Sequence, residues 1–207
     1  MDSILIETMC LPPIPVMSAI VRHSTLLVEG HEHYQKRSFR NRIHLNGPQG
    51  KVSFSIPLQS GKNSQMPIQD VRISYESPWH KILMKQINTN YGSAPFFEHL
   101  REDLYKILDK RWDFLWDMNL ALLNWVNDEL GQSVDIQRTE SYIKDYSDSF
   151  SDKRNHYHLK NIAHTETLSF SYEQVFSDEH GFLKDLSILD MLMSCGPASI
   201  LKLKGIN

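Results

Sequence analysis

The stretch SPWHKILMKQINTNY, residues 77–91, separates a part of the chain that favours strands from a part that favours helices. A proline fits the first turn of a helix, and the apolar side chains that follow recur every three to four residues: Trp79, Ile82, Leu83, Ile87 and Tyr91. Before residue 77 apolar and polar residues alternate, as in half-buried strands. The sequence therefore predicts strands mainly in residues 1–76 and helices after them.

Strands are predicted at several places upstream of this point. A turn signal at residues 46–50 lies between two segments, 42–45 and 51–58, whose apolar patterns predict a hairpin. Shorter segments with the composition of strands lie at 3–9, 26–29 and 71–75, and a short helix is predicted over 16–21.

Downstream, a three-helix block is predicted at residues 77–131, in which Pro95 precedes the second helix and residues 114–130 form the third. Gly92 is predicted to end the first helix in the left-handed conformation, and Gly131 is predicted to end the third helix. The remaining elements are a strand at 134–136, a polar surface loop at 145–158 and a helix at 186–193, with Ser187 as cap and Asp190 at capping-box spacing.

The order of these elements predicts the fold class α/β or α+β. In it a mixed β-sheet from the N-terminal third packs with the three-helix block at 77–131 and a short C-terminal helix. A length of 207 residues fits one domain, with 1–76 mainly strands, 77–131 helical and 132–207 mixed.

Composition limits the function classes. A net charge of −3 argues against general nucleic-acid binding, which requires a basic surface. No segment has the apolar length of a membrane span, and the N-terminal residues lack the pattern of a signal peptide. The two cysteines, Cys10 and Cys195, lie far apart and are interpreted as reduced thiols. We therefore expect a cytoplasmic protein.

The stretch HEHYQKRSFRNR, residues 31–42, is the strongest candidate for a functional site. Four basic side chains are predicted to bind an anion, because guanidinium and ammonium groups match phosphate and carboxylate: Lys36, Arg37, Arg40 and Arg42. Tyr34 and Asn41 are predicted to orient that ligand. The alternative is that these are solvated charges on an edge strand.

His31 and His33 are the candidate catalytic residues, because a histidine can accept or donate a proton near neutral pH. Their spacing of two residues places both on one face of a strand, with Glu32 on the other. The same spacing would suit a metal, but no HExxH, CxxC or compact cluster completes a site, so no metal is predicted. The simpler alternative is a histidine that hydrogen-bonds the backbone at a strand end.

Ordered landmarks run through nearly the whole chain: LPPI at 11–14, the stretch at 31–42, NYGSAPFFE at 90–98, LSILD at 186–190, and Gly196-Pro197. In these landmarks the sequence resembles the WbqC-like protein family. The resemblance implies a cytoplasmic bacterial protein, since some members are associated with the synthesis of O-antigen or other surface glycans. It implies no settled reaction, no cofactor and no catalytic residue.

Two hypotheses of function follow. The first is an enzyme of surface-glycan biosynthesis that acts on an anionic small molecule, such as a nucleotide-linked sugar or another phosphorylated compound. The second is a non-catalytic module that binds an anion or a partner protein in a biosynthetic assembly. Contact with single-stranded nucleic acid through the same basic and aromatic residues is a weaker third.

Overall fold

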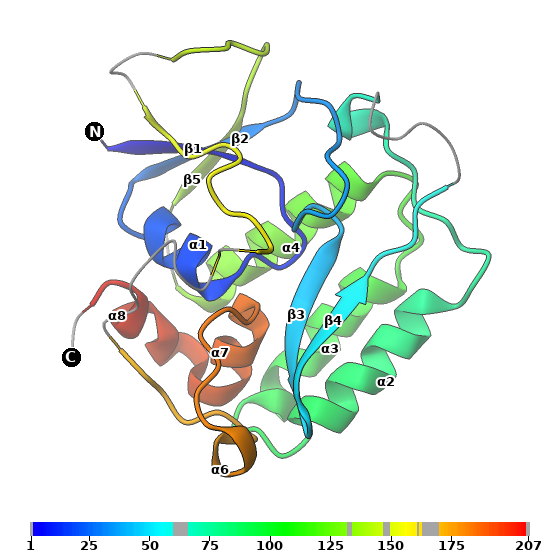
Figure 1. Ribbon diagram of the computed structural model, residues 1–207, viewed down its shortest axis with the longest axis vertical. Helices are drawn as coiled ribbons and strands as arrows, with labels where there is room; N and C mark the ends of the chain where they lie inside the picture. The colour runs from blue at the N-terminus through cyan, green and yellow to red at the C-terminus, as the bar shows by residue number, and fades with distance from the viewer. Residues whose placement is uncertain are drawn as a thin grey trace.

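Two small sheets and a set of helices make up the fold in the computed structural model, which describes residues 2–59, 66–131, 134–146, 150–160, 162 and 170–205 (Figure 1). Buried apolar side chains from Ile4 to Leu203 form one continuous core that includes residues of both sheets and of the helices. The predicted class, mixed α/β with a helical block and a C-terminal helix, is confirmed. None of the described helices is both long and apolar enough to cross a membrane.

The first sheet is parallel and has the strand order β5-β2-β1-β6. Its strands are β1 (Ser3–Glu7), β2 (Thr25–Glu29), β5 (Asp135–Arg138) and β6 (Ser151–Asp152). The central strand β1 is almost entirely buried, as expected for a strand covered on both faces. Helix α1 (Ile14–Ile20) connects β1 to β2 and is buried throughout.

The second sheet is the predicted hairpin of β3 (Arg42–Gly47) and β4 (Gly50–Ser55). Gly50 has a φ of 99°, a conformation that favours glycine and closes a turn tighter than the predicted five-residue loop. The strands of the N-terminal third are thus divided between two sheets, and not joined in one mixed sheet. The reason is that β1 and β2 pair with strands from the last third of the chain.

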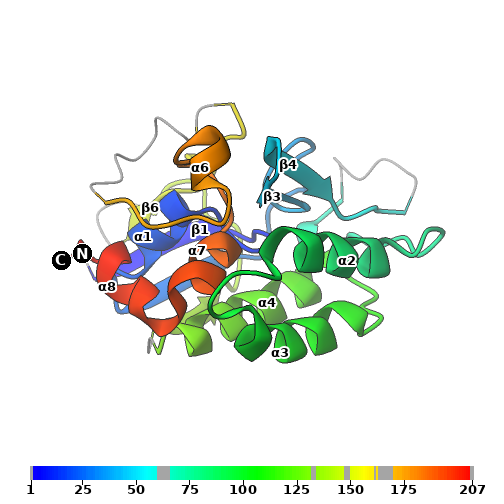
Figure 2. The ribbon, with the colours of Figure 1, turned by 90° about the horizontal axis from the view of Figure 1, so that it is seen from below.

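The three predicted helices are present as α2 (Trp79–Tyr91), α3 (Phe97–Asp109) and α4 (Leu115–Glu129). Figure 2 shows them gathered on one side of the molecule, with the hairpin beside α2. Gly131 ends the block, as predicted, and has a φ of 59°. Helix α2 ends at Tyr91 with Gly92 as its cap, as predicted, but the left-handed conformation predicted for Gly92 was wrong: its φ is −59°, and its N–H donates a helical hydrogen bond to Asn88 O.

The segment at 71–75, predicted as a strand, forms only isolated bridges after the short 3₁₀ helix Ile68–Asp70. Its backbone groups bond to different neighbours, since Ile73 N donates to Asp113 O and Ser74 N donates to Pro57 O. No single partner strand is therefore available to extend a ladder.

The last part of the chain holds α6 (Ser177–His180), α7 (Ile188–Cys195) and α8 (Ser199–Leu203). Ser187 caps α7 by accepting a hydrogen bond from Leu189 N, as predicted. Helix α8, which follows the expected stop at Gly196-Pro197, was not predicted. The described residues of the predicted surface loop at 145–158 include β6, the edge strand of the parallel sheet.

Candidate functional site

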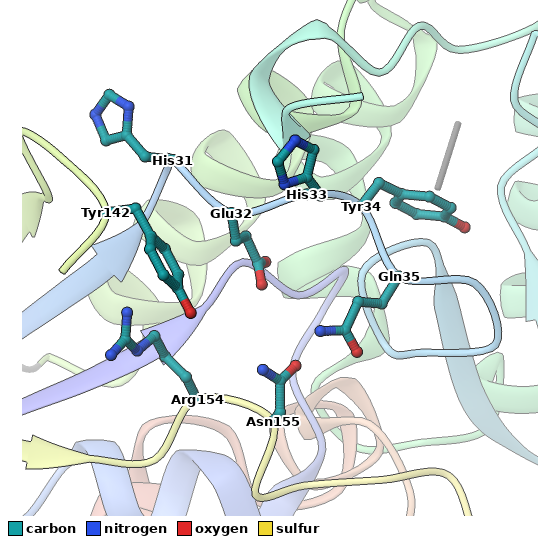
Figure 3. Close-up of a pocket in the computed structure, with 8 residues that line it drawn as sticks. All are labelled: His31, Glu32, His33, Tyr34, Gln35, Tyr142, Arg154 and Asn155. Atoms are coloured by element: carbon teal, nitrogen blue, oxygen red, sulfur yellow. The ribbon is translucent and has the colours of Figure 1, made fainter. Parts of the chain in front are cut away.

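A pocket of about 450 Å³ lies beyond the carboxyl ends of the parallel strands (Figure 3). We call it the carboxyl-edge pocket; it is lined by His31, Glu32, His33, Tyr34, Gln35, Tyr142, Arg154 and Asn155. Residues 31–35 follow β2, and residues 154–155 follow β6. Because β2 and β5 lie on one side of β1 and β6 lies on the other, this is where strand order reverses, the usual ligand position in open α/β sheets.

A cluster of buried charges forms the base of this pocket. Glu7 ends β1, and Arg40 places its guanidinium between Glu7 and Glu32. The Nε and Nη2 atoms of Arg40 donate to the two carboxylate oxygens of Glu32 at 2.7 and 2.5 Å, in the bidentate geometry of a strong ion pair. Arg40 is only 1% exposed, so its positive charge lies in the protein interior.

Arg154 forms the second ion pair of the cluster, with Glu29 at the end of β2. Its Nη1 donates to Glu29 Oε2 at 2.8 Å, and its Nη2 donates to Asp152 Oδ2 at 2.6 Å. The guanidinium lies 5.0 Å from the ring centre of Tyr142 and 5.2 Å from that of Tyr146. These contacts fix Arg154 at the pocket wall.

Burial affects the acidic groups of the cluster unequally. Burial raises the pKa of Glu7 and of Glu32, although Arg40 opposes the rise. Burial also acts to raise the pKa of Asp152, but hydrogen bonds from Arg154 outweigh it and lower that pKa. The ion pair with Arg154 therefore keeps Asp152 ionised, whereas Glu7 and Glu32 accept protons more readily than exposed carboxylates.

The predicted catalytic histidines both line the pocket. Figure 3 shows their rings on one side of the segment and the carboxylate of Glu32 on the other, as the spacing predicts. The Nε2 of His31 lies 3.0 Å from Thr139 O. A carbonyl oxygen only accepts hydrogen bonds, so Nε2 carries the proton and Nδ1 is the basic nitrogen of the neutral ring. His33 is exposed.

Tyr34 and Asn41, the predicted orienting residues, are in direct contact. The hydroxyl of Tyr34 donates to Asn41 Oδ1 at 3.0 Å, and Asn41 Nδ2 donates to Ile56 O at 2.9 Å. The pair connects the pocket wall to the residue that follows the hairpin. Tyr34 is buried.

The four predicted anion-binding side chains point to different places. Arg40 is buried beneath the carboxyl-edge pocket, and Lys36 is exposed and lines neither that pocket nor its neighbour. Arg37 and Arg42 line this neighbouring pocket of about 350 Å³, together with His158, Leu159 and Lys160. The basic stretch thus contributes to two pockets and one buried ion pair.

Sequence reasoning missed Glu7, Glu29, Arg154, Asn155 and Tyr142. Glu7 and Glu29 had a usable signal, because each is a carboxylate directly at the end of an apolar strand. Arg154 and Asn155 had none, since they follow a two-residue strand inside a polar segment.

The described part of the chain does not support a reactive Cys10 thiol or a metal site built from His, Cys, Asp or Glu. Burial raises the pKa of the Cys10 thiol to about 12, which leaves it protonated and unreactive at neutral pH. No group of three or more His, Cys, Asp or Glu side chains among the described residues has the arrangement of a metal site.

Comparison with known proteins places these residues in a family. The model of the WbqC-like protein family matches residues 8–169, so the chain belongs to this family. The matched range includes every residue that lines the carboxyl-edge pocket and its neighbour. Searches of curated proteins and of solved structures give no match.

Proposed function

From this family membership and the position of the carboxyl-edge pocket, we propose that the protein is an enzyme of surface-glycan biosynthesis that acts on an anionic small molecule. The observation that carries the proposal is the convergence of polar side chains from two strand ends at the point where strand order reverses. We place the reaction in the cytoplasm, a compartment in which Cys10 and Cys195 remain free thiols.

His31 is the proposed proton acceptor. Its ring is held by the hydrogen bond from Nε2 to Thr139 O, and its backbone N–H donates to Glu29 Oε1 at 2.9 Å. In the neutral ring this leaves Nδ1 to take a proton from a bound substrate. A histidine positioned in this way contributes about 10²- to 10⁴-fold to the rate of a proton-transfer step.

The remaining side chains of the pocket bind and orient the substrate in this proposal. The amides of Gln35 and Asn155 supply donors and acceptors, and Tyr142, exposed at the rim, supplies a flat surface. Arg40 is a positioning residue, since it acts through Glu32 and through Asn155 Oδ1, to which its Nη2 donates at 3.0 Å.

The first test is a thermal-shift screen of the protein against nucleotide sugars, nucleotides, coenzyme A thioesters, sugar phosphates and divalent metals. A ligand at one hundred times its dissociation constant adds about 2.7 kcal/mol to the free energy of unfolding. We expect at least one phosphorylated compound to stabilise the protein. A screen without any stabilising compound would contradict the proposal.

The second test is turnover of the stabilising compound by wild type and by His31→Gln. Glutamine keeps an N–H donor for Thr139 O but lacks a basic nitrogen. We expect turnover to fall about 10²-fold or more, whereas the thermal shift persists. His33→Gln is the matched control for a histidine in the same segment, and an equal loss in both variants would argue against a specific role for His31.

The alternative is a non-catalytic module that binds a partner in a biosynthetic assembly. It is supported by Tyr142 and Ile143, which are 54% and 45% exposed beside the pocket. This alternative predicts binding without turnover in wild type, a result that the enzyme proposal excludes.

A further inference from the structure

Three of the five described residues that line the pocket next to the carboxyl-edge pocket are cationic. We call it the basic pocket; Arg37, Arg42 and Lys160 line it together with His158 and Leu159. None of the described residues that line it is a carboxylate. Arg37, His158 and Lys160 are exposed and Arg42 is half-buried, so a ligand from solvent can reach all four.

In the part of the chain that the structure describes, the two arginines and the lysine of the basic pocket have no acidic partner. Within the described ranges, no carboxylate forms an ion pair with Arg37, Arg42 or Lys160. Arg42 uses Nε to donate to Ser55 Oγ at 3.0 Å, which leaves its two terminal nitrogens for a ligand. Arg40 and Arg154 differ, because buried carboxylates already neutralise both. The basic pocket therefore has positive charge available for an anion.

The backbone beneath this pocket is strained. Arg37 has a φ of 57°, a left-handed conformation that costs an L-residue about 1 kcal/mol or more. Ser38 helps to hold the turn, since its hydroxyl donates to Gln35 O at 2.6 Å. Asn155, which lines the carboxyl-edge pocket, has a φ of 56°. Strain of this kind concentrates at sites that position a ligand.

The two pockets are lined by different residues of the same two segments of chain. Gln35 lines one pocket and Arg37 lines the other, and two residues of chain span at most about 7 Å. The second segment repeats the arrangement, since Asn155 belongs to the carboxyl-edge pocket and His158 to the basic pocket. A ligand of a few ångströms to about one nanometre can therefore extend from one pocket into the other.

We propose that the basic pocket binds the phosphoryl group of the substrate, while the part of the substrate that reacts occupies the carboxyl-edge pocket. The inference rests on the proposed function and narrows the substrate class to a sugar phosphate or a sugar linked to a nucleoside diphosphate. Arginine forks match phosphate oxygens in pairs, and Lys160 adds a point charge.

The test is calorimetric titration of the full chain with inorganic pyrophosphate, using wild type, Arg37→Gly and Lys160→Ala. Glycine adopts the φ of Arg37 without strain, so this variant removes the charge without a loss of folding stability. Lys36→Ala is the control, because it removes a neighbouring charge that does not line the pocket. We expect pyrophosphate affinity to fall at least tenfold in the first two variants and less than twofold in the control.

Three outcomes would overturn the inference: no binding by wild type, unchanged affinity in Arg37→Gly, or an equal loss in Lys36→Ala, which would indicate general charge attraction. The outcome of the test of the basic pocket can be distinguished from the outcome of the test of the proposed function. Pyrophosphate binding without turnover of any sugar phosphate supports the basic pocket and contradicts the enzyme. Turnover that is unaffected by Arg37→Gly supports the enzyme and contradicts the basic pocket.

Discussion

Two clusters in this protein contain buried carboxyl groups, and the two clusters provide different hydrogen-bond partners for them. In the carboxyl-edge cluster, arginines face the carboxylates, with Arg40 against Glu32 and Arg154 against Glu29. In the second cluster, Asp190 of α7 is fully buried and accepts hydrogen bonds from neutral groups, Tyr172 at 2.5 Å and Gln174 at 3.0 Å. The first cluster adjoins a pocket, whereas Asp190 lines neither of the two pockets discussed above.

The difference shows which cluster is suited to function. Arginine remains charged throughout the physiological range, so the carboxyl-edge cluster keeps its ion pairs and presents fixed donors to the pocket. Asp190 lacks such a partner, and burial raises its pKa to about 6 despite the opposing hydrogen bonds from Tyr172 and Gln174. Its hydrogen bonds connect α7 to the segment at 172–174, which is a structural role.

The largest effect is expected from Arg40→Met, which keeps much of the side-chain volume but leaves Glu32 and Glu7 without their cation. Removing one partner of a buried ion pair costs about 3–5 kcal/mol. Urea denaturation should show this loss in the free energy of unfolding.

The double variant Arg40→Met/Glu32→Gln is the matched control, and it should recover part of the loss because one uncompensated carboxylate is gone. A loss below about 1 kcal/mol in Arg40→Met would mean that the ion pair is exposed to water, and the contrast between the clusters would disappear.

The next effect is a pH dependence from Asp190, whose pKa rises from an ordinary value of 3.8 to about 6 on folding. Well below pH 3.8 the carboxyl is protonated in both states, so this contribution to stability is fully present. As the pH rises from 4 to 6 the unfolded chain releases its proton first, and stability falls by about 3 kcal/mol in total.

Asp190→Asn should remove this contribution, so that the difference in stability between variant and wild type changes across pH 4–6 and is constant above about pH 7. Denaturation curves at a series of pH values measure it. A difference that is constant over the whole range would show that Asp190 ionises normally in the fold.

The smallest effect is expected at an exposed ion pair, which gives a baseline for the two buried clusters. Arg101 Nη2 lies 2.9 Å from Glu98 Oε2 on α3, with both side chains largely exposed. Because water screens such pairs, Arg101→Ala should change the free energy of unfolding by less than about 0.5 kcal/mol. A larger change would indicate that Arg101 stabilises the fold through packing on Phe97, whose ring centre lies 5.7 Å away.

The longer elements of the fold could be predicted from local pattern, but short elements such as β6 and α8, and the pairing of the strands, could not. The spacing of Trp79, Leu83 and Ile87 is enough to identify α2, and the turn at 46–50 identifies the hairpin. Nothing local indicates that β1 pairs with β6, because two residues are too few to carry a period. The division into two sheets follows from such long-range contacts.

The stretch at 31–42 indicated the candidate site, but the geometry of the site could not be predicted. Alternation placed His31 and His33 opposite Glu32 correctly. The regular strand β2 ends at Glu29, so the sequence could not show that Arg40 turns inward while Arg37 and Arg42 line another pocket. The tertiary fold brings Arg154 and Asn155 to the site, and no local sequence pattern indicates their position there.

The most direct test of the account is a crystal structure of the protein grown with the phosphorylated sugar that stabilises it most in the thermal-shift screen. We expect the phosphoryl group to lie between Arg37, Arg42 and Lys160, and the sugar to lie beside His31 and Arg154. A ligand bound elsewhere, such as in the groove of α2 and α3 beside Tyr105, with both pockets empty, would contradict it.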